Sequence, residues 1–174
     1  MNDDLYKKEV AYIPFQSRVW AKSSLLVYLM SIQFVIVLVL AIVLEQSFFL
    51  LALVVVAIGL GGNYYVFWRR MRYFLQGIRI SQAKIVQLDL YLKDENQHIQ
   101  LPLHHLKVEF IRNGGRGRYI LLRFYNQQQL LGFQYDLKAW NHDQLAEVFT
   151  KIKALKEEAL TRQEERMLKK GFFG

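Results

Sequence analysis

A short glycine-rich and basic run, from Asn113 to Arg118, is the segment best equipped for chemistry. Its backbone amides and the guanidinium groups of Arg116 and Arg118 could bind a phosphate group. The run precedes a predicted strand, however, so it lacks the helix N-terminus on which phosphate-binding loops rely. The pattern therefore favours a plain hairpin turn, and if the loop binds a ligand we expect a lipid headgroup.

The remaining reactive side chains do not form a recognisable site. His104 and His105 are adjacent, so in a strand they would point to opposite faces and could not chelate one ion together. Asp136, His142 and Asp143 lie close in sequence, but no serine accompanies them, and a turn and a helix start explain them better. The chain has no cysteine, which excludes disulfides and thiolate chemistry. We expect no catalytic residue, no metal and no cofactor.

Two long apolar segments determine where these residues lie. Residues 24–44 and 47–68 contain no Asp, Glu, Lys or Arg, and each reaches the roughly 20 residues that a helix needs to cross a bilayer. Only Glu45 and Gln46 separate them. The sequence therefore predicts a transmembrane hairpin over residues 24–68. A cleaved signal peptide is the competing interpretation, but its apolar region would be shorter and would not be followed at once by a second one.

Basic residues flank the hairpin on both outer sides, and its connector has none. Because bases accumulate on the cytoplasmic side of membrane helices, both termini are predicted to be cytoplasmic in a multi-pass protein of the cytoplasmic (inner) membrane. The bases after the second segment are also candidates for contact with anionic lipid headgroups. These bases are Lys7, Lys8, Arg18 and Lys22 before the hairpin, and Arg69, Arg70 and Arg72 after it.

Inside the hairpin, one polar residue and a group of small residues are candidates for helix packing. Gln33 lies near the middle of the first segment, at about the depth of Gly59 in the second, and either bonds across the hairpin or to a partner helix, or is tolerated without a role. Ala57, Gly59, Gly61 and Gly62 allow close approach of another helix. With no ionisable group in either segment, an ion pathway made by this chain alone is not expected.

Beyond Arg72 the hydrophobic pattern changes to a period of two, which indicates half-buried strands. Turn residues such as Asn96 and Asn126 fall between the apolar sets. Evenly spaced short strands predict an antiparallel sheet or barrel. The alternating apolar sets are Ile78 and Ile80; Val86, Leu88, Leu90 and Leu92; Ile99, Leu101 and Leu103; Leu106, Val108 and Phe110; Ile120, Leu122 and Phe124; and Leu131, Phe133 and Tyr135.

A helix is predicted after the strands. Asn141 or Asp143 can cap it, and apolar residues from Leu145 to Leu155 then recur at helical spacing on one face, which should close the end of the sheet. Beyond Lys156 the chain is charged on nearly every side, so the helix is expected to continue into water. Two phenylalanines beside two lysines end the sequence, which leaves open a frayed end or a membrane or partner contact.

Four regions follow from these patterns. They are a cytoplasmic N-terminal segment (1–23), the membrane hairpin (24–68), a cytosolic domain (69–155) and a charged helical extension with a tail (156–174). From Arg69 onward the chain has 19 basic and 11 acidic residues, which accounts for the whole net charge of +8. A basic domain held beside a membrane matches the anionic inner leaflet.

Three stretches carry a resemblance to a known family: Gly77 to Ile80, Ile99 to Val108, and Gly117 to Leu122. With the hairpin before them and the amphipathic helix after them, residues 24–155 resemble the bacterial PH-like domain membrane proteins. The resemblance implies an α+β domain in which an antiparallel PH-like barrel or sheet is closed by a C-terminal helix. It also implies a non-enzymatic module that binds lipid, peptide or another membrane subunit. The long charged C-terminal extension departs from that pattern.

The sequence thus predicts a non-catalytic, membrane-anchored binding or scaffold protein whose basic domain engages lipid headgroups or a protein partner. The alternative is a structural or accessory subunit of a larger membrane complex, such as a secretion or transport machine. An accessory enzyme whose site is shared with a partner is a further possibility. The expected partners are membrane lipids and either a membrane protein or a second copy of the chain. Nucleic acid is not expected, because no reading helix or binding motif accompanies the positive charge.

Overall fold

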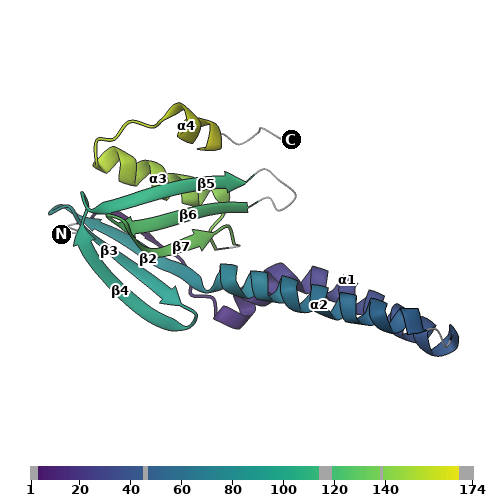
Figure 1. Ribbon diagram of the computed structural model, residues 1–174. Helices are drawn as coiled ribbons and strands as arrows, with labels where there is room; N and C mark the ends of the chain where they lie inside the picture. The colour runs from purple at the N-terminus through teal and green to yellow at the C-terminus, as the bar shows by residue number, and fades with distance from the viewer. Residues whose placement is uncertain (1–3, 45–46, 114–118, 138, 169–174) are drawn as a thin grey trace. The chain divides into compact units, whose positions relative to one another are not determined.

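The computed structural model describes residues 4–44, 47–113, 119–137 and 139–168. The Arg116 and Arg118 loop and the two C-terminal phenylalanines lie outside the described residues. The chain divides into two compact units, one formed by Met1–Tyr12 with Tyr73–Gly174 and the other by Ile13–Arg72 (Figure 1). The second unit is therefore inserted into the sequence of the first, and we describe each by itself.

The inserted unit is a pair of antiparallel helices, α1 (Phe15–Leu44) and α2 (Ser47–Met71), of 30 and 25 residues. Helix α1 begins nine residues before the predicted segment. The two helices approach closely at Gly59, where an added Cβ would lie 2.9 Å from Cε of Met30. Both helices are long and apolar enough to cross a membrane, and only 6% and 0% of their most apolar stretches, Ser23–Leu40 and Leu51–Met71, are buried.

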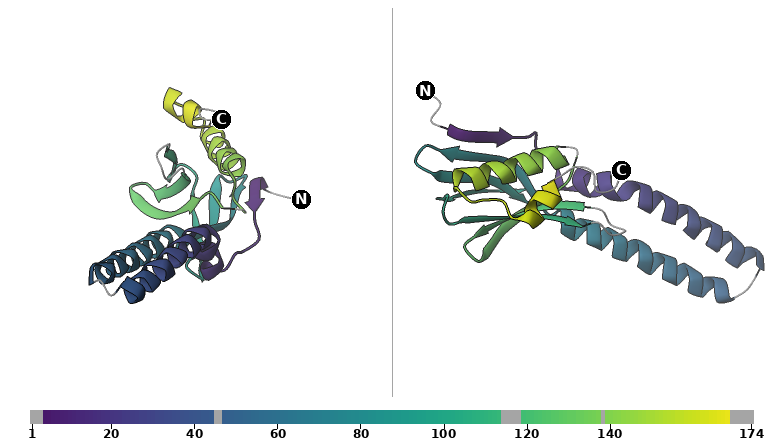
Figure 2. Two further views of the ribbon diagram at one scale, coloured as in Figure 1. Left: turned by 90° about the vertical axis from the view of Figure 1, so that its right-hand side faces the viewer. Right: turned by 90° about the horizontal axis from the view of Figure 1, so that it is seen from above.

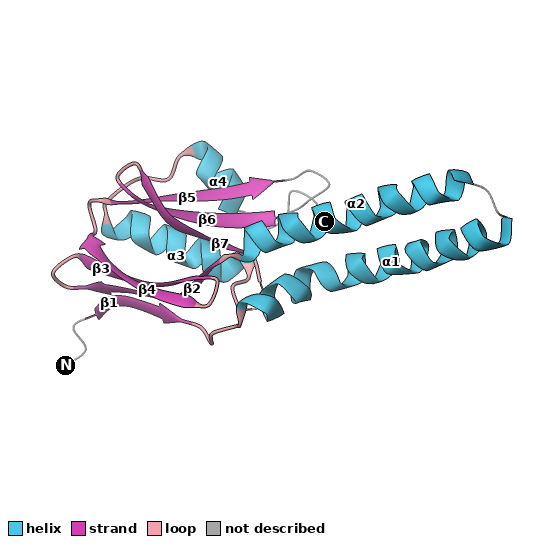
Figure 3. Ribbon diagram, turned by 60° about the horizontal axis from the view of Figure 1, so that its bottom comes forward, coloured by secondary structure: helices cyan, strands magenta, loops and turns pink. Residues whose placement is uncertain are grey.

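The first sheet of the other unit contains four antiparallel strands in the order β1-β2-β3-β4 (Figure 3). The strand from before the helices pairs directly with the strand that follows them, with Lys8 opposite Ile78 and Glu9 opposite Gly77. The sequence did not predict this first strand. The strands are β1 (Asp4–Glu9), β2 (Tyr73–Ser81), β3 (Ile85–Leu92) and β4 (Glu95–Pro102).

The second sheet contains β5 (Leu106–Asn113), β6 (Tyr119–Asn126) and β7 (Gln129–Tyr135), again antiparallel and in sequence order. Each alternating apolar set in the sequence corresponds to one of the strands β2 to β7, so the predicted α+β domain with antiparallel sheets is confirmed. Within the described residues the two sheets stay separate and form no closed barrel.

A buried polar contact joins the two sheets at Leu75, beside a register shift in β2. The Leu75 N–H donates to Oε1 of Gln134 at 2.7 Å, and the Leu75 carbonyl accepts from Nε1 of Trp140 at 2.5 Å. Gln134 and Trp140 are both 0% exposed. Leu75 stays in register with Leu90 of β3, but it lies beyond the end of β1, whose last pair is Glu9 with Gly77. The two side chains therefore satisfy main-chain groups that would otherwise be buried without partners.

Helix α3 (His142–Leu155) begins with a capping box, in which Asn141 Oδ1 accepts from the Gln144 N–H at 3.0 Å and Gln144 Oε1 accepts from the Asn141 N–H at 2.9 Å. Asn141 rather than Asp143 is therefore the cap. The helix packs on β5 and β6 (Figure 2). Its buried face consists of Leu145, Val148, Phe149 and Ile152, and Leu155, which the helical spacing placed on the same face, is only half-buried.

The predicted continuation of this helix past Lys156 into water is wrong. Helix α3 ends at Leu155, and Glu157 has a φ of 59°, in the left-handed region that ends helices. A second short helix, α4 (Arg162–Leu168), then follows. It starts with its own capping box, in which Thr161 and Glu164 exchange hydrogen bonds of 2.7 and 3.2 Å. The charged segment therefore turns back and lies next to β5.

Candidate functional site

A groove of about 760 Å³ lies between β5 and the C-terminal helices, within the sheet unit. We call it the β5 groove. Its strand side and its helical side come from parts of the chain that are far apart in sequence. The strand side consists of residues 107–111 with His104, His105 and Gln127, and the helical side consists of Lys153, Lys156, Glu158, Thr161, Gln163, Glu164 and Met167.

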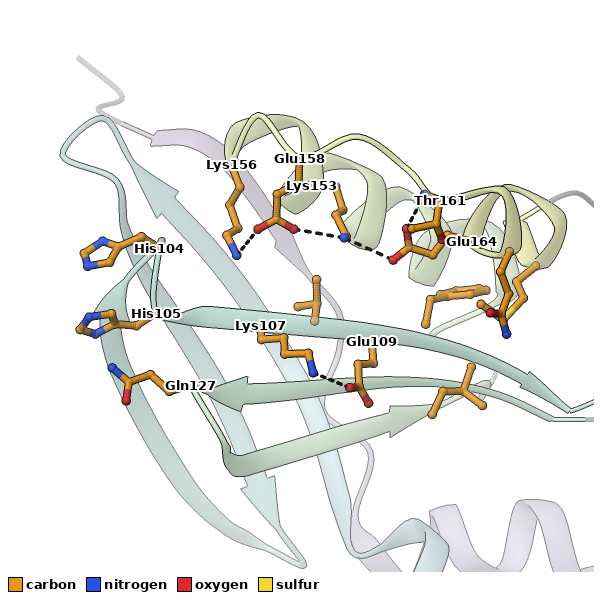
Figure 4. A pocket seen from close by; sticks show the side chains of 15 residues that line it. His104, His105, Lys107, Glu109, Gln127, Lys153, Lys156, Glu158, Thr161 and Glu164 are labelled. Carbon is orange, nitrogen blue, oxygen red and sulfur yellow. Dashed lines mark hydrogen bonds and ion pairs between the residues drawn. The ribbon is translucent and has the colours of Figure 1, made fainter.

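A row of ion pairs forms the helical side of the groove (Figure 4). Lys153 Nζ lies 3.1 Å from Glu158 and 3.2 Å from Glu164, so one ammonium group holds two carboxylates. Lys156 Nζ lies 2.5 Å from Glu158 and also donates to the carbonyl of Leu106 at 3.0 Å. Both lysine side chains are only 15% exposed. They lie on or beside α3, whereas the two carboxylates come from the segment that turns back.

The strand side has a second charge cluster, centred on Glu109. Lys107 Nζ lies 2.9 Å from this carboxylate, and the Tyr125 hydroxyl donates to it at 3.1 Å. The hydrogen bond from Lys107 and then that from Tyr125, which together outweigh partial burial, hold the pKa of Glu109 below its usual range. The carboxylate is therefore ionised at neutral pH and paired to its own strand and the neighbouring one.

Charge pairing also shifts the pKa values of the residues on the helical side of the groove. Burial alone would lower the pKa of Lys153, but hydrogen bonds to Glu158 and Glu164 outweigh it and raise that pKa. The hydrogen bond from Lys156 lowers the pKa of Glu158. For Glu164, burial acts to raise the pKa, and hydrogen bonds from Thr161 and Lys153 lower it by more. All of these groups are therefore charged near neutrality.

These shifts predict that α4 leaves α3 at acidic pH. A lowered glutamate pKa gives a stabilisation that is present above the unfolded pKa of about 4 and is lost as the pH falls through the folded value. The raised pKa of Lys153 gives a stabilisation that persists up to about pH 10 and is lost above it. A bimane fluorophore on a single cysteine at Met167, in the full-length protein in detergent, should report docking from about pH 5 to 9 and a red-shifted, solvated emission below about pH 4.

A matched variant separates this effect from general acid unfolding. With Lys153→Met the carboxylates lose their shared partner, so the fluorophore should report a solvated environment at every pH. An emission that stays unshifted in the unsubstituted background until the sheet unit itself unfolds in acid would contradict the ion-pair account of α4 docking.

The charges that line the groove are equal in number. Lys107, Lys153 and Lys156 balance Glu109, Glu158 and Glu164 in number, so its charges are already internally compensated. Among the residues that the structure describes, no group of three or more His, Asp or Glu side chains could hold a metal ion. The groove also lies within the range of 300–1,000 Å³ typical of ligand sites.

Two histidines differ from expectation in their local structure. His104 and His105 lie in the turn between β4 and β5, not in a strand, and their ring centroids are 4.2 Å apart. His98, which has no evident partner in the sequence, lies directly opposite Asp89 on the neighbouring strand, with Nδ1 2.5 Å from the carboxylate. His98 is largely exposed, and this pair belongs to the outer face of the first sheet.

The lipid-contact candidates are not part of the β5 groove. Arg69 and Arg70 lie in the last turn of α2, and Arg72 lies between α2 and β2. Arg116 and Arg118 fall outside the described residues.

The packing candidates separate into two groups. Gly59 faces Met30 across the helix pair, and Gln33, which the sequence puts at about the depth of Gly59, is exposed on α1. Gly61 and Gly62 have no atom within 4 Å of an added Cβ, so they do not pack within the hairpin. Ala57 is also exposed.

The site that sequence analysis missed is the β5 groove. One sequence signal pointed to it: Thr161 and Glu164 have the spacing of a capping box, which predicts a new helix start within the charged segment. Comparison of the chain with protein-family models, with curated proteins and with solved structures gives no match.

Proposed function

We propose that the protein is a two-pass protein of the cytoplasmic membrane whose hairpin anchors a small, non-catalytic binding domain at the inner leaflet. The proposal depends chiefly on one observation, the exposure of the apolar side chains of α1 and α2. Leu25 is 72% exposed, and Ile42 and Ile58 are each 69% exposed. Apolar surfaces of this extent are rare on soluble monomers, and hydrocarbon is the solvent in which they are stable.

The strand pairing supports a hairpin that crosses the membrane twice. Strand β1 precedes both helices and strand β2 follows them, and the two strands belong to one sheet. Two strands of one sheet must lie on the same side of a bilayer, because an open sheet cannot pass through hydrocarbon. The chain must therefore cross an even number of times between Glu9 and Tyr73. This argument does not depend on the distribution of bases.

The distribution of bases supports placing that side in the cytoplasm. Arg69, Arg70 and Arg72 follow the apolar part of α2 directly, and in this proposal they contact the phosphates of anionic lipids. Each such base contributes roughly 1 kcal/mol near an anionic surface. The relation to PH-like membrane proteins is part of the same proposal, and the four-stranded and three-stranded antiparallel sheets with a helix after them support it.

Single cysteines test the topology, because the chain contains none of its own. We expect cysteines at Leu5 in β1 and at Glu95 in β4 to resist a membrane-impermeant maleimide in intact bacterial cells and to react in inside-out vesicles. A cysteine at Gln46, between the helices, should react in the opposite way. The outcome that contradicts the proposal is reaction of the Leu5 and Glu95 sites from opposite sides, or recovery of the protein in the soluble fraction after carbonate extraction.

A second candidate function, a subunit of a larger membrane complex, is favoured by the exposed polar and small residues of the hairpin. Gln33, Gly61 and Gly62 face away from the neighbouring helix, and such residues stabilise contacts between membrane helices. Purification in mild detergent followed by mass spectrometry distinguishes the two functions. Recovery of other membrane proteins in stoichiometric amounts supports the complex, and recovery of the protein alone supports an independent module.

A further inference from the structure

Strand β5 is the edge of its sheet, and part of its main chain faces the groove. The Gln127 N–H donates to the His105 carbonyl at 2.9 Å. Since hydrogen-bonded and non-hydrogen-bonded pairs alternate in an antiparallel ladder, Lys107 and Glu109 bond to β6, whereas Leu106, Val108 and Phe110 direct their N–H and C=O groups away from it. The ladder between β5 and β6 has no register shift that would interrupt this alternation.

Within the part of the chain that the structure describes, Leu106 alone among these three residues has a partner on the groove side. The Leu106 carbonyl accepts from Lys156 Nζ at 3.0 Å. Within the described residues, no strand pairs with this edge, since the order of the sheet is β5-β6-β7. The main-chain groups of Val108 and Phe110 therefore form a template for one more strand.

On the opposite side of the groove, the lysines lie on or beside a firmly packed helix, whereas the glutamates lie on a segment with few packing contacts. Lys153 belongs to α3, which four buried apolar residues attach to the sheets. Glu158 and Glu164 belong to the segment that turns back, and α4 has no buried residue. The attachment of this segment therefore depends largely on ion pairs, and those of Glu158, a side chain that is 41% exposed, contribute little in water. If the segment moves away, Lys153 and Lys156 lose their carboxylates while remaining in place.

We propose that the β5 groove binds an extended, acidic peptide segment of a partner protein. The peptide adds to β5 as a strand, and its carboxylates replace Glu158 and Glu164 on Lys153 and Lys156. The two glutamates are thus internal substitutes for the ligand, and the segment that carries them competes with it. This inference rests on the proposed function, because it names the partner class of the binding domain.

Both halves of the site favour a peptide over a lipid headgroup. A headgroup can pair with the two lysines, but it has no repeating donors and acceptors to match the edge of β5. In a strand, alternate side chains lie about 6.8 Å apart on one face, so carboxylates at every second residue can follow the lysines while the backbone pairs with Val108 and Phe110.

The test uses the full-length protein in detergent micelles and a fluorescein-labelled heptapeptide in which Glu and Val alternate. Fluorescence anisotropy should show that Glu158→Gln with Glu164→Gln binds this peptide about tenfold more tightly than the unsubstituted protein, because the competing carboxylates are gone. Adding Lys153→Gln to that pair should weaken binding about tenfold. A heptapeptide in which Lys replaces Glu is the matched control and should not bind.

Hydrogen exchange distinguishes strand addition from simple charge pairing. Saturation with the acidic peptide should slow amide exchange in residues 106–113, and a peptide whose central valine is proline should not. Three results would each overturn the proposal: no saturable binding to the doubly substituted protein, binding that is unaffected by Lys153→Gln, or protection of β5 by phosphatidylglycerol vesicles in place of the peptide. The topology of the hairpin is tested separately by cysteine labelling, so a negative result for peptide binding would not contradict the proposed membrane anchor.

Discussion

Replacing Trp140 with alanine is expected to lower the free energy of unfolding of the sheet unit by about 4 kcal/mol, the middle of the range for deleting a large buried aromatic side chain. Trp140 is fully buried, and its indole N–H donates to the Leu75 carbonyl at 2.5 Å. Removal therefore leaves a cavity between the sheets and a buried carbonyl without its donor.

Two substitutions separate the contributions of the Trp140 side chain. Trp140→Phe keeps most of the aromatic packing and removes the donor, so it should cost about 1 to 3 kcal/mol. Leu130→Ala, at a side chain that is 40% exposed, is a surface control and should cost at most about 0.5 kcal/mol. Pulse proteolysis of the full-length protein in urea and mild detergent gives the three values. Equal losses for Phe and Ala would show that packing of the ring contributes little.

The contacts of Leu75 show what the sequence could predict and what it could not. The alternation of apolar residues locates strand β2, because a half-buried strand repeats every two residues. The register shift beside Leu75, and the bonds that Gln134 and Trp140 make to its main chain, depend on residues far along the chain. From sequence alone Gln134 is expected to be exposed, because its hydrogen-bond partner, the N–H of Leu75, is distant in the chain.

Strand β1 escaped prediction for a related reason. Its sequence, from Asp4 to Glu9, is mostly charged, and only Tyr6 is buried. An edge strand with lysines and glutamates has no hydrophobic alternation, and such residues are typical of edges that avoid aggregation. The strand forms because it pairs with the edge of β2, which follows the inserted helices in sequence. In addition, the hydroxyl of Tyr6 donates to Glu147 of α3. Neither partner is local in sequence.

The β5 groove could not be predicted from the sequence either, because its two sides come from segments that are distant in the chain. The charged segment after Lys156 has the composition of a solvated helix, and local pattern alone favours its continuation. One local signal opposes this, the capping box at Thr161. The left-handed conformation of Glu157, which ends the helix, is evident only in the structure. Glu158 and Glu164 both reach Lys153 because the chain reverses direction after α3, and the sequence pattern does not predict that reversal.

The second large effect concerns Ile58, which lies near the middle of the apolar stretch of α2 and is 69% exposed. Ile58→Arg is expected to disfavour membrane insertion by about 3 kcal/mol, because a central arginine costs roughly that amount on insertion scales. The carbonate-resistant fraction of the full-length protein, measured in membranes of an expressing bacterium, should fall sharply. Ile58→Leu is the matched control and should leave that fraction unchanged.

Whether Ile58→Arg is harmful or harmless depends on whether water or hydrocarbon surrounds the helices. In water, exchanging a largely exposed isoleucine for arginine removes apolar surface, so it should be neutral for stability and should improve solubility. In hydrocarbon, the same exchange places a charge where it has no partner, and insertion is lost. An Ile58→Arg protein that is more soluble and folds as before would therefore overturn the membrane anchor. A protein that fails to insert, while Ile58→Leu inserts normally, would establish that α2 is surrounded by lipid at this depth.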